Sequence, residues 1–207
     1  MKKSILLKFL PILFLLLTVF LTGCTSSGVT DVDVAEPDMN QQETPEGLAK
    51  AVYAGGCFWG VEYYFEKLEG VFDAVSGYTG GTTENPTYRE VLNHTTGHVE
   101  AVEVTYDPSV ISFEDLTKYF FEIHDPTQAN GQGPDIGNQY LSVVFYQNEQ
   151  EKKSVDKLIE ILKNEGFDIA TSVTPSAVFW PAELYHQDYY QEKGSLPYCH
   201  FYTKRFP

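Results

Sequence analysis

The chain contains few cysteines and few basic residues, and it lacks the common nucleotide-binding motifs. Its 207 residues include 3 cysteines and 14 Lys and Arg, against 29 Asp and Glu. The formal net charge of −15 argues against a nucleic-acid partner, because phosphate backbones are bound by basic surfaces. Neither a P-loop nor a glycine-rich dinucleotide fingerprint occurs, so no nucleotide-binding site is indicated.

Patterns of metal ligands are equally scarce. His94 and His98 are four residues apart, but Gly97 and the start of a strand separate them, so they share no helical face. The other histidines are scattered, and no Cys-x-x-Cys pair is present. We expect no metal site. A Cys–His hydrolase stays open, because partners in space cannot be read from spacing.

The first 24 residues have the pattern of an export signal. Lys2 and Lys3 precede an apolar run over 5–20, and Leu21–Cys24 spells Leu-Thr-Gly-Cys, which resembles a bacterial lipobox. That resemblance implies a lipoprotein signal peptide over 1–23 and lipidation of Cys24. An uncleaved transmembrane anchor and an ordinary secretory signal are the alternatives.

The next segment predicts a tether and a single domain. Residues 24–48 are polar, acidic and without sustained periodicity, which is typical of a flexible linker. Residues 49–207 are long enough for one domain with a substantial core. We therefore expect an extracytoplasmic lipoprotein of a bacterial cell envelope, held on the membrane by acyl chains on Cys24.

Strands and helices alternate irregularly along the domain. Apolar patterning predicts strands over 49–55, 71–81, 98–108 and 139–146. Helical patterning begins near Cys57 with a stop at Gly70, continues over 112–124 with Ser112 as N-cap, and recurs over 148–166. The tail from Tyr185 is aromatic and irregular. Such a mixture favours an α+β fold.

Cys57 lies where a strand is predicted to turn into a helix. Gly55 and Gly56 allow the sharp turn, and the first backbone N–H groups of a helix favour a thiolate. Cys57 is therefore a candidate nucleophile. The alternative is a buried, inert core cysteine.

Glu100 lies on a strand with apolar neighbours. Alternation places it on one face with Val102, Val104 and Tyr106, where loss of water would raise its pKa and favour a general acid. The pattern also allows the strand to be buried on its other face. Tyr78 and Tyr140 lie beside glycine turns and could donate hydrogen bonds, but composition singles out neither of them.

Several ordered blocks together resemble the A-type peptide-methionine sulfoxide reductases. The resemblance covers about residues 51–207 and is carried by GGCFWG (55–60), SGYTGG (76–81), NPTYREV (85–91), GHVEAVEVTYDP (97–108), HDPTQ (124–128), DIGNQY (135–140) and YHQDYY (185–190). It implies a two-layer sandwich of a mixed β-sheet with helices, a ferredoxin-like core and a long irregular C-terminal segment.

The resemblance also implies the roles of the reacting groups. Cys57 would attack the sulfur of methionine S-sulfoxide, and Glu100 would protonate the sulfoxide oxygen. Tyr78 and Tyr140 would hydrogen-bond that oxygen.

Three further residues would shape the substrate site. Phe58 and Trp59 would hold the ε-methyl group, and Asp135 matches a polar residue that lines the site.

A second thiol completes the implied cycle. Attack would leave Cys57 as a sulfenic acid, which condenses with another thiol. Cys199 is similar to the resolving cysteine of many family members, so a Cys57–Cys199 disulfide would form. A thioredoxin-like protein or another external dithiol would reduce it, without an organic cofactor or metal.

Some positions depart from the family pattern, and two other functions stay open. Leu141 and Gly131 stand where arginine is frequent, and Pro134 stands where asparagine is frequent. These departures put peptide binding near that loop in question. A thiol peroxidase also uses a sulfenic acid and a resolving thiol, and a non-catalytic surface lipoprotein would need only one structural disulfide.

Overall fold

The computed structural model describes residues 44–207. The predicted signal segment, Cys24 and most of the predicted tether therefore lie outside the described residues. The strands are β1 (Ala49–Gly55), β2 (Val71–Thr79), β3 (Val99–Tyr106), β4 (Gly131–Gln132), β5 (Asp135–Ile136), β6 (Ser142–Tyr146), β7 (Ser172–Pro175) and β8 (Trp180–Pro181). The α-helices are α1 (Phe58–Phe65), α2 (Tyr88–Leu92), α3 (Phe113–Ile123), α4 (Glu149–Asn164) and α5 (Tyr189–Lys193).

One mixed sheet organises the described chain. Its strand order is β7-β6-β1-β3-β2-β8, with β6 and β7 parallel and the other neighbours antiparallel. The chain order β1-α1-β2-β3-α3-β6 builds the four central strands, which is the ferredoxin-like arrangement. The α+β class predicted from the sequence is confirmed.

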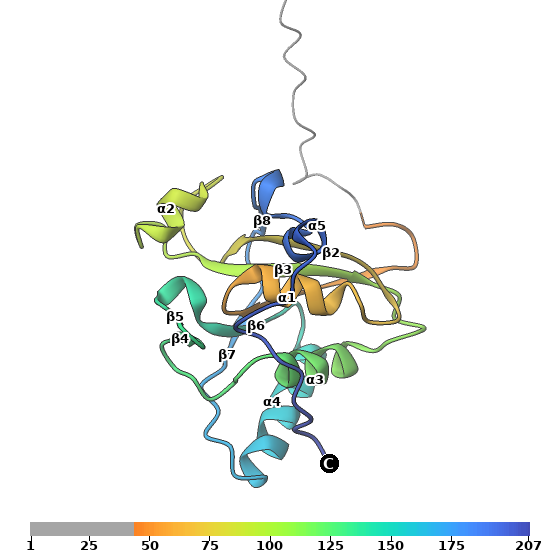
Figure 1. Cartoon of the computed structure of the whole chain (residues 1–207). Coiled ribbons are helices and arrows are strands. Elements are labelled where there is room, and N and C mark those ends of the chain that lie inside the picture. Colours follow the sequence, from red (N-terminus) through yellow and green to blue (C-terminus); the bar gives the residue numbers. More distant parts are fainter. Residues whose placement is uncertain (1–43) are drawn as a thin grey trace, which may run out of the picture. The chain divides into compact units, whose positions relative to one another are not determined.

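Helices α1, α3 and α4 share one core with the sheet (Figure 1). Tyr53 of β1 lies at its centre, stacked at 5.1 Å on Phe65 and at 5.0 Å on Phe120. Its hydroxyl is paired with Thr117 Oγ1 at 3.0 Å, so the buried phenol keeps a partner. Ser112 caps α3 by accepting a hydrogen bond from the Asp115 N–H, as the sequence predicted.

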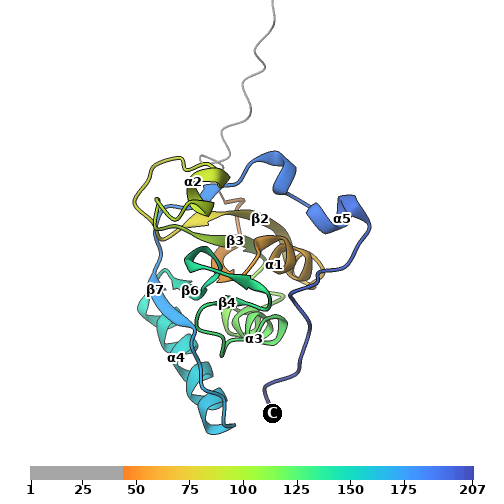
Figure 2. The same cartoon turned by 60° about the vertical axis from the view of Figure 1, so that its left-hand side comes forward.

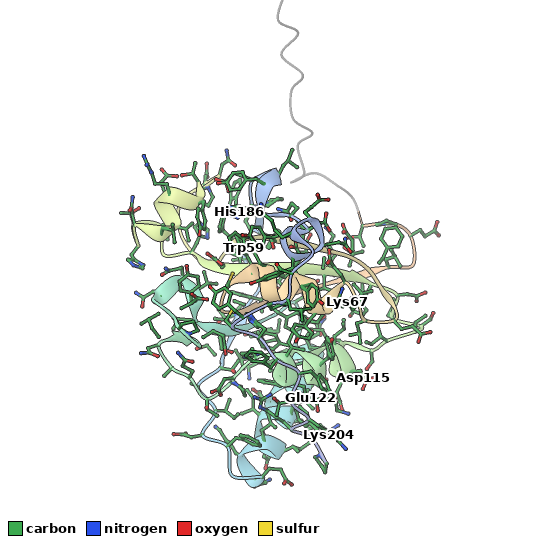
Figure 3. All side chains as sticks on the ribbon, in the orientation of Figure 1. Trp59, Lys67, Asp115, Glu122, His186 and Lys204 are labelled. Carbon is green, nitrogen blue, oxygen red and sulfur yellow. The ribbon has the colours of Figure 1, made fainter. Side chains whose placement is uncertain are left out.

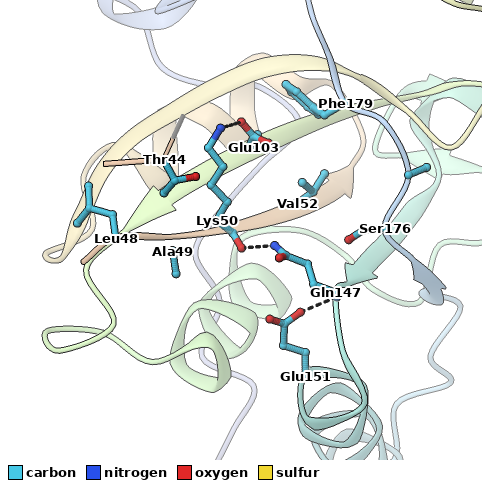
Figure 4. Close-up of a pocket in the computed structure, with 11 residues that line it drawn as sticks. Thr44, Leu48, Ala49, Lys50, Val52, Glu103, Gln147, Glu151, Ser176 and Phe179 are labelled. Carbon is cyan, nitrogen blue, oxygen red and sulfur yellow. Dashed lines mark hydrogen bonds and ion pairs between the residues drawn. The ribbon is translucent and has the colours of Figure 1, made fainter. Parts of the chain in front are cut away.

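The opposite face of the sheet carries a smaller apolar cluster that includes Val52, Ala54 and Phe145. A pocket lies on this side, with the Lys50–Glu103 ion pair at its wall (Figure 4). None of the predicted catalytic or substrate-binding residues lines this pocket. Within residues 44–207, no helix is both long and apolar enough to span a membrane.

The C-terminal segment is largely irregular and runs past α1 and α3 (Figure 2). Backbone hydrogen bonds attach it, including Thr203 N–H to Glu122 O at 2.7 Å. Two local predictions differ from the structure. Helix α1 ends at Phe65 because the next residues form tight turns leading to Gly70, whose φ is 91°. The tail also contains α5, which packs beside α1.

Candidate active site

The β1–α1 junction fixes the position of Cys57. Gly56 has φ of 96°, and a Cβ there would overlap the Gln132 side chain, so the turn requires glycine. Cys57 then occupies the N-cap of α1, with a thiol that is 6% exposed. The turn thus delivers a nearly buried sulfur to the start of a helix.

Glu100 meets Cys57 at the same helix start. The carboxyl is 1% exposed, and its Oε2 accepts a hydrogen bond from the Phe58 N–H at 3.1 Å. Burial raises the pKa of Glu100 well above its ordinary value, and the negative charge of Asp135 acts in the same direction. These effects outweigh the opposing hydrogen bond from Phe58. Glu100 is therefore a protonated acid near neutral pH, on the core face that includes Val102 and Val104.

The surroundings of Cys57 act on the pKa of its thiol in opposite directions. A hydrogen bond with Cys199 and burial together raise the pKa of the Cys57 thiol. The backbone N–H of Trp59 acts in the expected direction and lowers it, but its effect is smaller. The sequence predicted that the helix start favours the thiolate, and the Trp59 N–H acts in that direction. Burial and the neighbouring Cys199 act against it and favour the protonated thiol.

Tyr78 is the partner of Glu100 on the neighbouring strand, and its hydroxyl is bonded to Glu183. Its side chain is fully buried, and its hydroxyl donates a hydrogen bond to Glu183 Oε2 at 2.9 Å. The same carboxylate accepts a hydrogen bond from the Tyr88 N–H through Oε1 at 3.0 Å. The bond between Tyr78 and Glu183 ties β2 to the segment after β8.

Tyr88 is a site residue that the analysis of single positions missed. Burial raises the pKa of its phenol, and ionisation of Glu100, Tyr140 or Cys57 would raise it further, which places Tyr88 near these groups. Burial and the Glu100 charge likewise raise the pKa of Tyr140 to about 12. Both phenols are protonated donors near neutral pH. Tyr88 belongs to the NPTYREV block of the family resemblance, so this block could have identified it as a site residue.

Phe58 and Trp59 form an aromatic wall beside Cys57. Phe58 is 1% exposed and contacts Tyr88 and His186. The Trp59 ring is stacked on Tyr189 at 3.7 Å, and its Nε1–H donates a hydrogen bond to His186 Nδ1 at 3.1 Å. Figure 3 shows Trp59 and His186 close together. The indole is therefore held in one orientation by residues of the C-terminal segment.

Asp135 reaches the site from β5. Both of its carboxylate oxygens accept hydrogen bonds from the Tyr198 hydroxyl, at 3.0 and 2.9 Å. Its charge contributes to raising the pKa values of Cys57, Glu100 and Tyr140. Asp135 therefore lies near the reacting groups, next to the segment that carries the second thiol.

The loop before β5 has a backbone that suits the unusual residue at 131. Gly131 has φ of 152°, and a Cβ there would overlap the carbonyl oxygen of Asp135. An arginine at this position would require a different loop. Pro134 lies in the turn between β4 and β5, and Leu141 packs on the smaller apolar cluster. The backbone of this loop is therefore compatible with glycine at 131, and the loop leads directly to Asp135.

Cys199 and Cys57 are both free, buried thiols, and the neighbouring Cys199 raises the pKa of Cys57. The Cys199 sulfur lies 3.1 Å from His200 Nδ1. The structure thus brings together Cys57, Glu100, Tyr140, Asp135 and Cys199, and it pairs the Tyr78 hydroxyl with Glu183. In the part of the chain that the structure describes, no group of three or more His, Cys, Asp or Glu side chains is arranged to hold a metal ion.

Comparison with known proteins identifies the family. A family model described as peptide methionine sulfoxide reductase matches residues 49–206. The peptide methionine sulfoxide reductase MsrA of Nautilia profundicola is 47% identical over 152 residues, which cover 73% of this chain and 88% of the relative.

Solved structures agree with this match. Mxr1 from Saccharomyces cerevisiae in its reduced form is 34% identical, with a TM-score of 0.72 over 78% of this chain and 95% of Mxr1. Mxr1 in complex with Trx2 is similar at a TM-score of 0.53 and 27% identity, over 78% of this chain and 94% of that one. The chain therefore belongs to the peptide methionine sulfoxide reductase family, enzymes that reduce methionine sulfoxide.

Proposed function

We propose that Cys57 attacks the sulfur of methionine S-sulfoxide while Glu100 protonates the oxygen. The observation that carries this proposal is the meeting of the Cys57 thiol and the buried Glu100 carboxyl at the start of α1. A sulfoxide oxygen leaves only after protonation, so a neutral acid beside the nucleophile suits the reaction. The preference for the S-epimer rests on the family resemblance.

Two phenols and an aromatic wall complete the substrate site. Tyr88 and Tyr140 donate hydrogen bonds to the sulfoxide oxygen, because both phenols lie near Glu100 and stay protonated. Phe58 and Trp59 contact the ε-methyl group, and Asp135 lines the polar side of the site. Tyr78 acts through Glu183, which accepts hydrogen bonds from Tyr78 and from the backbone of Tyr88.

The thiol becomes reactive when the substrate enters. Transfer of the Glu100 proton to the sulfoxide oxygen, together with attack by Cys57, forms the sulfur–sulfur bond. The thiol proton of Cys57 passes to Glu100 and restores the acid. The hydroxyl oxygen then moves from the methionine sulfur to the Cys57 sulfur as the S–O bond of the substrate and the new sulfur–sulfur bond break, so methionine leaves and Cys57 becomes a sulfenic acid. Cys199 condenses with this group to form a Cys57–Cys199 disulfide. A thioredoxin-like dithiol reduces the disulfide, which is supported by the solved complex of Mxr1 with Trx2.

Turnover with separate epimers tests this proposal. The purified protein is incubated with a dithiol and a peptide that contains one epimer of methionine sulfoxide, and methionine is measured. We expect reduction of the S-epimer and loss of reduction in Cys57→Ser. Reduction of neither epimer, or full activity in Cys57→Ser, would contradict the proposal. Turnover of peroxide without turnover of sulfoxide would instead favour a thiol peroxidase.

We also propose that the enzyme repairs oxidised proteins outside the cytoplasm of a bacterial cell. The support is the sequence of the first 24 residues: Lys2 and Lys3, the apolar run, and the Leu-Thr-Gly-Cys ending. Acyl chains on Cys24 would hold the catalytic domain at a membrane surface through an acidic tether.

Fatty-acid labelling tests this location. Cells that express the wild type should incorporate a labelled fatty acid into the protein and retain it in the membrane fraction. The Cys24→Ala variant should lose the label. Equal labelling of both proteins would contradict lipidation at Cys24, and an unlabelled wild-type protein in the cytoplasmic fraction would contradict the proposed location.

A further inference from the structure

His200 is a buried side chain to which neither the sequence nor the proposed reaction assigns a role. It follows Cys199 directly and is 1% exposed. Its ring packs against two glycines, one at the end of β1 and one in α1. Nε2 is 2.7 Å from the Gly55 carbonyl oxygen, and a Cβ on Gly60 would overlap the ring. The imidazole therefore lies against the turn that carries Cys57, and His200 itself directly follows Cys199 in the chain.

The hydrogen bonds of His200 define which ring nitrogen carries the proton. A carbonyl oxygen can only accept a hydrogen bond, so Nε2 must be the protonated nitrogen. In the neutral ring, Nδ1 then has a free lone pair. The Cys199 sulfur lies 3.1 Å from Nδ1 and can only donate its S–H to this lone pair.

Burial keeps the ring in this neutral form. It lowers the pKa of His200 to about 4, while the Gly55 carbonyl and the Asp135 charge act in the opposite direction. The titratable groups around the ring are Cys199, Asp135, His124 and Tyr64, whose hydroxyl donates to the His200 carbonyl oxygen. At neutral pH, the ring therefore offers an unprotonated nitrogen to Cys199.

We propose that His200 is the general base that activates Cys199 for formation of the disulfide. This inference rests on the proposed function, in which Cys57 becomes a sulfenic acid and Cys199 resolves it. The Cys199 sulfur attacks the Cys57 sulfur, and an S–S bond forms as the S–O bond breaks. Nδ1 accepts the Cys199 proton and returns it to the departing hydroxide, which leaves as water. The sulfenic acid supplies the oxidising equivalents, so no other oxidant is required.

The arrangement explains how a buried thiol could react quickly. A thiol needs its thiolate form to attack, and burial opposes that charge. Transfer of the proton to an adjacent imidazole couples deprotonation to attack, and the Gly55 carbonyl and Asp135 stabilise the transient imidazolium. The first step of the reaction, which occurs at Cys57, does not require this base.

A single-turnover experiment without a reductant separates the two steps. The reduced protein is mixed with one equivalent of methionine sulfoxide peptide. Methionine is followed by chromatography, the sulfenic acid by a dimedone-type trap, and the disulfide by mass spectrometry. His200→Gln should release methionine at the wild-type rate, accumulate trappable sulfenic acid, and form the disulfide about 100-fold more slowly at pH 7.

The pH profile distinguishes a lost base from a displaced side chain. Wild-type disulfide formation should be flat between pH 6 and 8, because His200 is already neutral. In His200→Gln, the rate should rise about tenfold per pH unit, because only the ionised Cys199 reacts. His200→Asn, which can accept the S–H hydrogen bond without taking the proton, should behave in the same way and serves if His200→Gln does not fold.

His124→Gln is the matched control, since His124 is also a buried neutral histidine and its hydrogen bonds are to Phe120 and Ser142. It should keep the flat pH profile. Wild-type disulfide kinetics in both His200 variants would overturn the inference. Methionine release by the wild type without a Cys57–Cys199 disulfide would also overturn it, leaving the first step intact. No methionine from the wild type would instead overturn the proposed function on which the inference rests.

Discussion

At the scale of single residues, environment decides which candidate groups can react. Cys57 lies at the start of a helix and Glu100 lies on a buried face of a strand, and these positions decide the protonation of both side chains. Glu100 stays protonated because burial opposes its charge. Cys57 is protonated before substrate enters, because Cys199 and burial outweigh the pull of the helix backbone.

The two tyrosines illustrate what the sequence could not predict. Tyr78 and Tyr88 both belong to blocks of the family pattern, and their spacing says nothing about where their hydroxyls point. The partner of Tyr78 is Glu183, 105 residues further along the chain, and only the folded chain brings them together. His200 was likewise unassigned, because its contacts with Gly55 and Gly60 depend on the course of the C-terminal segment.

Paired substitutions test the different roles of these phenols. Tyr88→Phe should lower kcat/KM for sulfoxide reduction by about tenfold with little loss of stability, because it removes a donor to the substrate oxygen. Tyr78→Phe should cost about 1 kcal/mol of unfolding free energy, since Glu183 loses a partly buried hydrogen bond, with a smaller effect on kcat/KM. Steady-state kinetics and urea unfolding measure both. A larger catalytic loss in Tyr78→Phe would restore Tyr78 to the substrate site.

At the scale of secondary-structure elements, the sequence predicted the central strands and helices well. Period-two alternation located β3, and the cap at Ser112 located the start of α3. The end of α1 and the helix α5 were not predicted, because the local sequence pattern is weak at both places. Helix α1 ends at Phe65 because turn-forming residues follow it, and α5 is short, with much of its packing against α1.

The β1–α1 junction is the element on which the site depends most. Gly56→Ala should cost more than 2 kcal/mol of unfolding free energy and at least tenfold in activity, because its Cβ would overlap Gln132 and displace Cys57. Gly47→Ala is a matched control, since Gly47 also has a positive φ of 87° but has no atom within 4 Å of its added Cβ. Its cost should be about 1 kcal/mol at most, with unchanged activity. Equal losses of stability and activity in the two variants would show that Gly56 is needed only for its backbone angle.

At the scale of the whole molecule, a ferredoxin-like sheet supplies the frame and a long irregular tail completes the site. The frame follows from the alternation of strands and helices, which local patterns predict. The tail contributes Glu183, His186, Tyr189 and Cys199 through contacts that no local pattern encodes. Correct packing of the tail against the sheet and helices is therefore required for a complete active site.

Buried carboxyls also predict how global stability depends on pH. Burial and the Glu66 charge raise the pKa of Glu62 to about 8, although Ser76 donates to its carboxylate. The native state thus binds a proton that the unfolded chain has lost between about pH 4.5 and 8. Over this window, Glu62 lowers stability by up to about 1.4 kcal/mol per pH unit as the pH rises.

Glu62→Gln should therefore weaken the fall in stability between pH 5 and pH 8, because glutamine carries no charge at either pH while its oxygen still accepts from Ser76. Urea unfolding at the two pH values measures the difference. The same dependence on pH in the variant and the wild type would show that Glu62 titrates normally in the folded protein.

The central claim is that Glu100 gives a proton to the sulfoxide oxygen as Cys57 attacks. The most direct test is the single-turnover rate of methionine release from reduced Glu100→Gln, with Glu103→Gln as control because Glu103 lies on the same strand and pairs with Lys50 outside the site. Glu100→Gln should slow methionine release by 10²-fold or more, and Glu103→Gln should leave it unchanged. Wild-type release from Glu100→Gln would contradict the account.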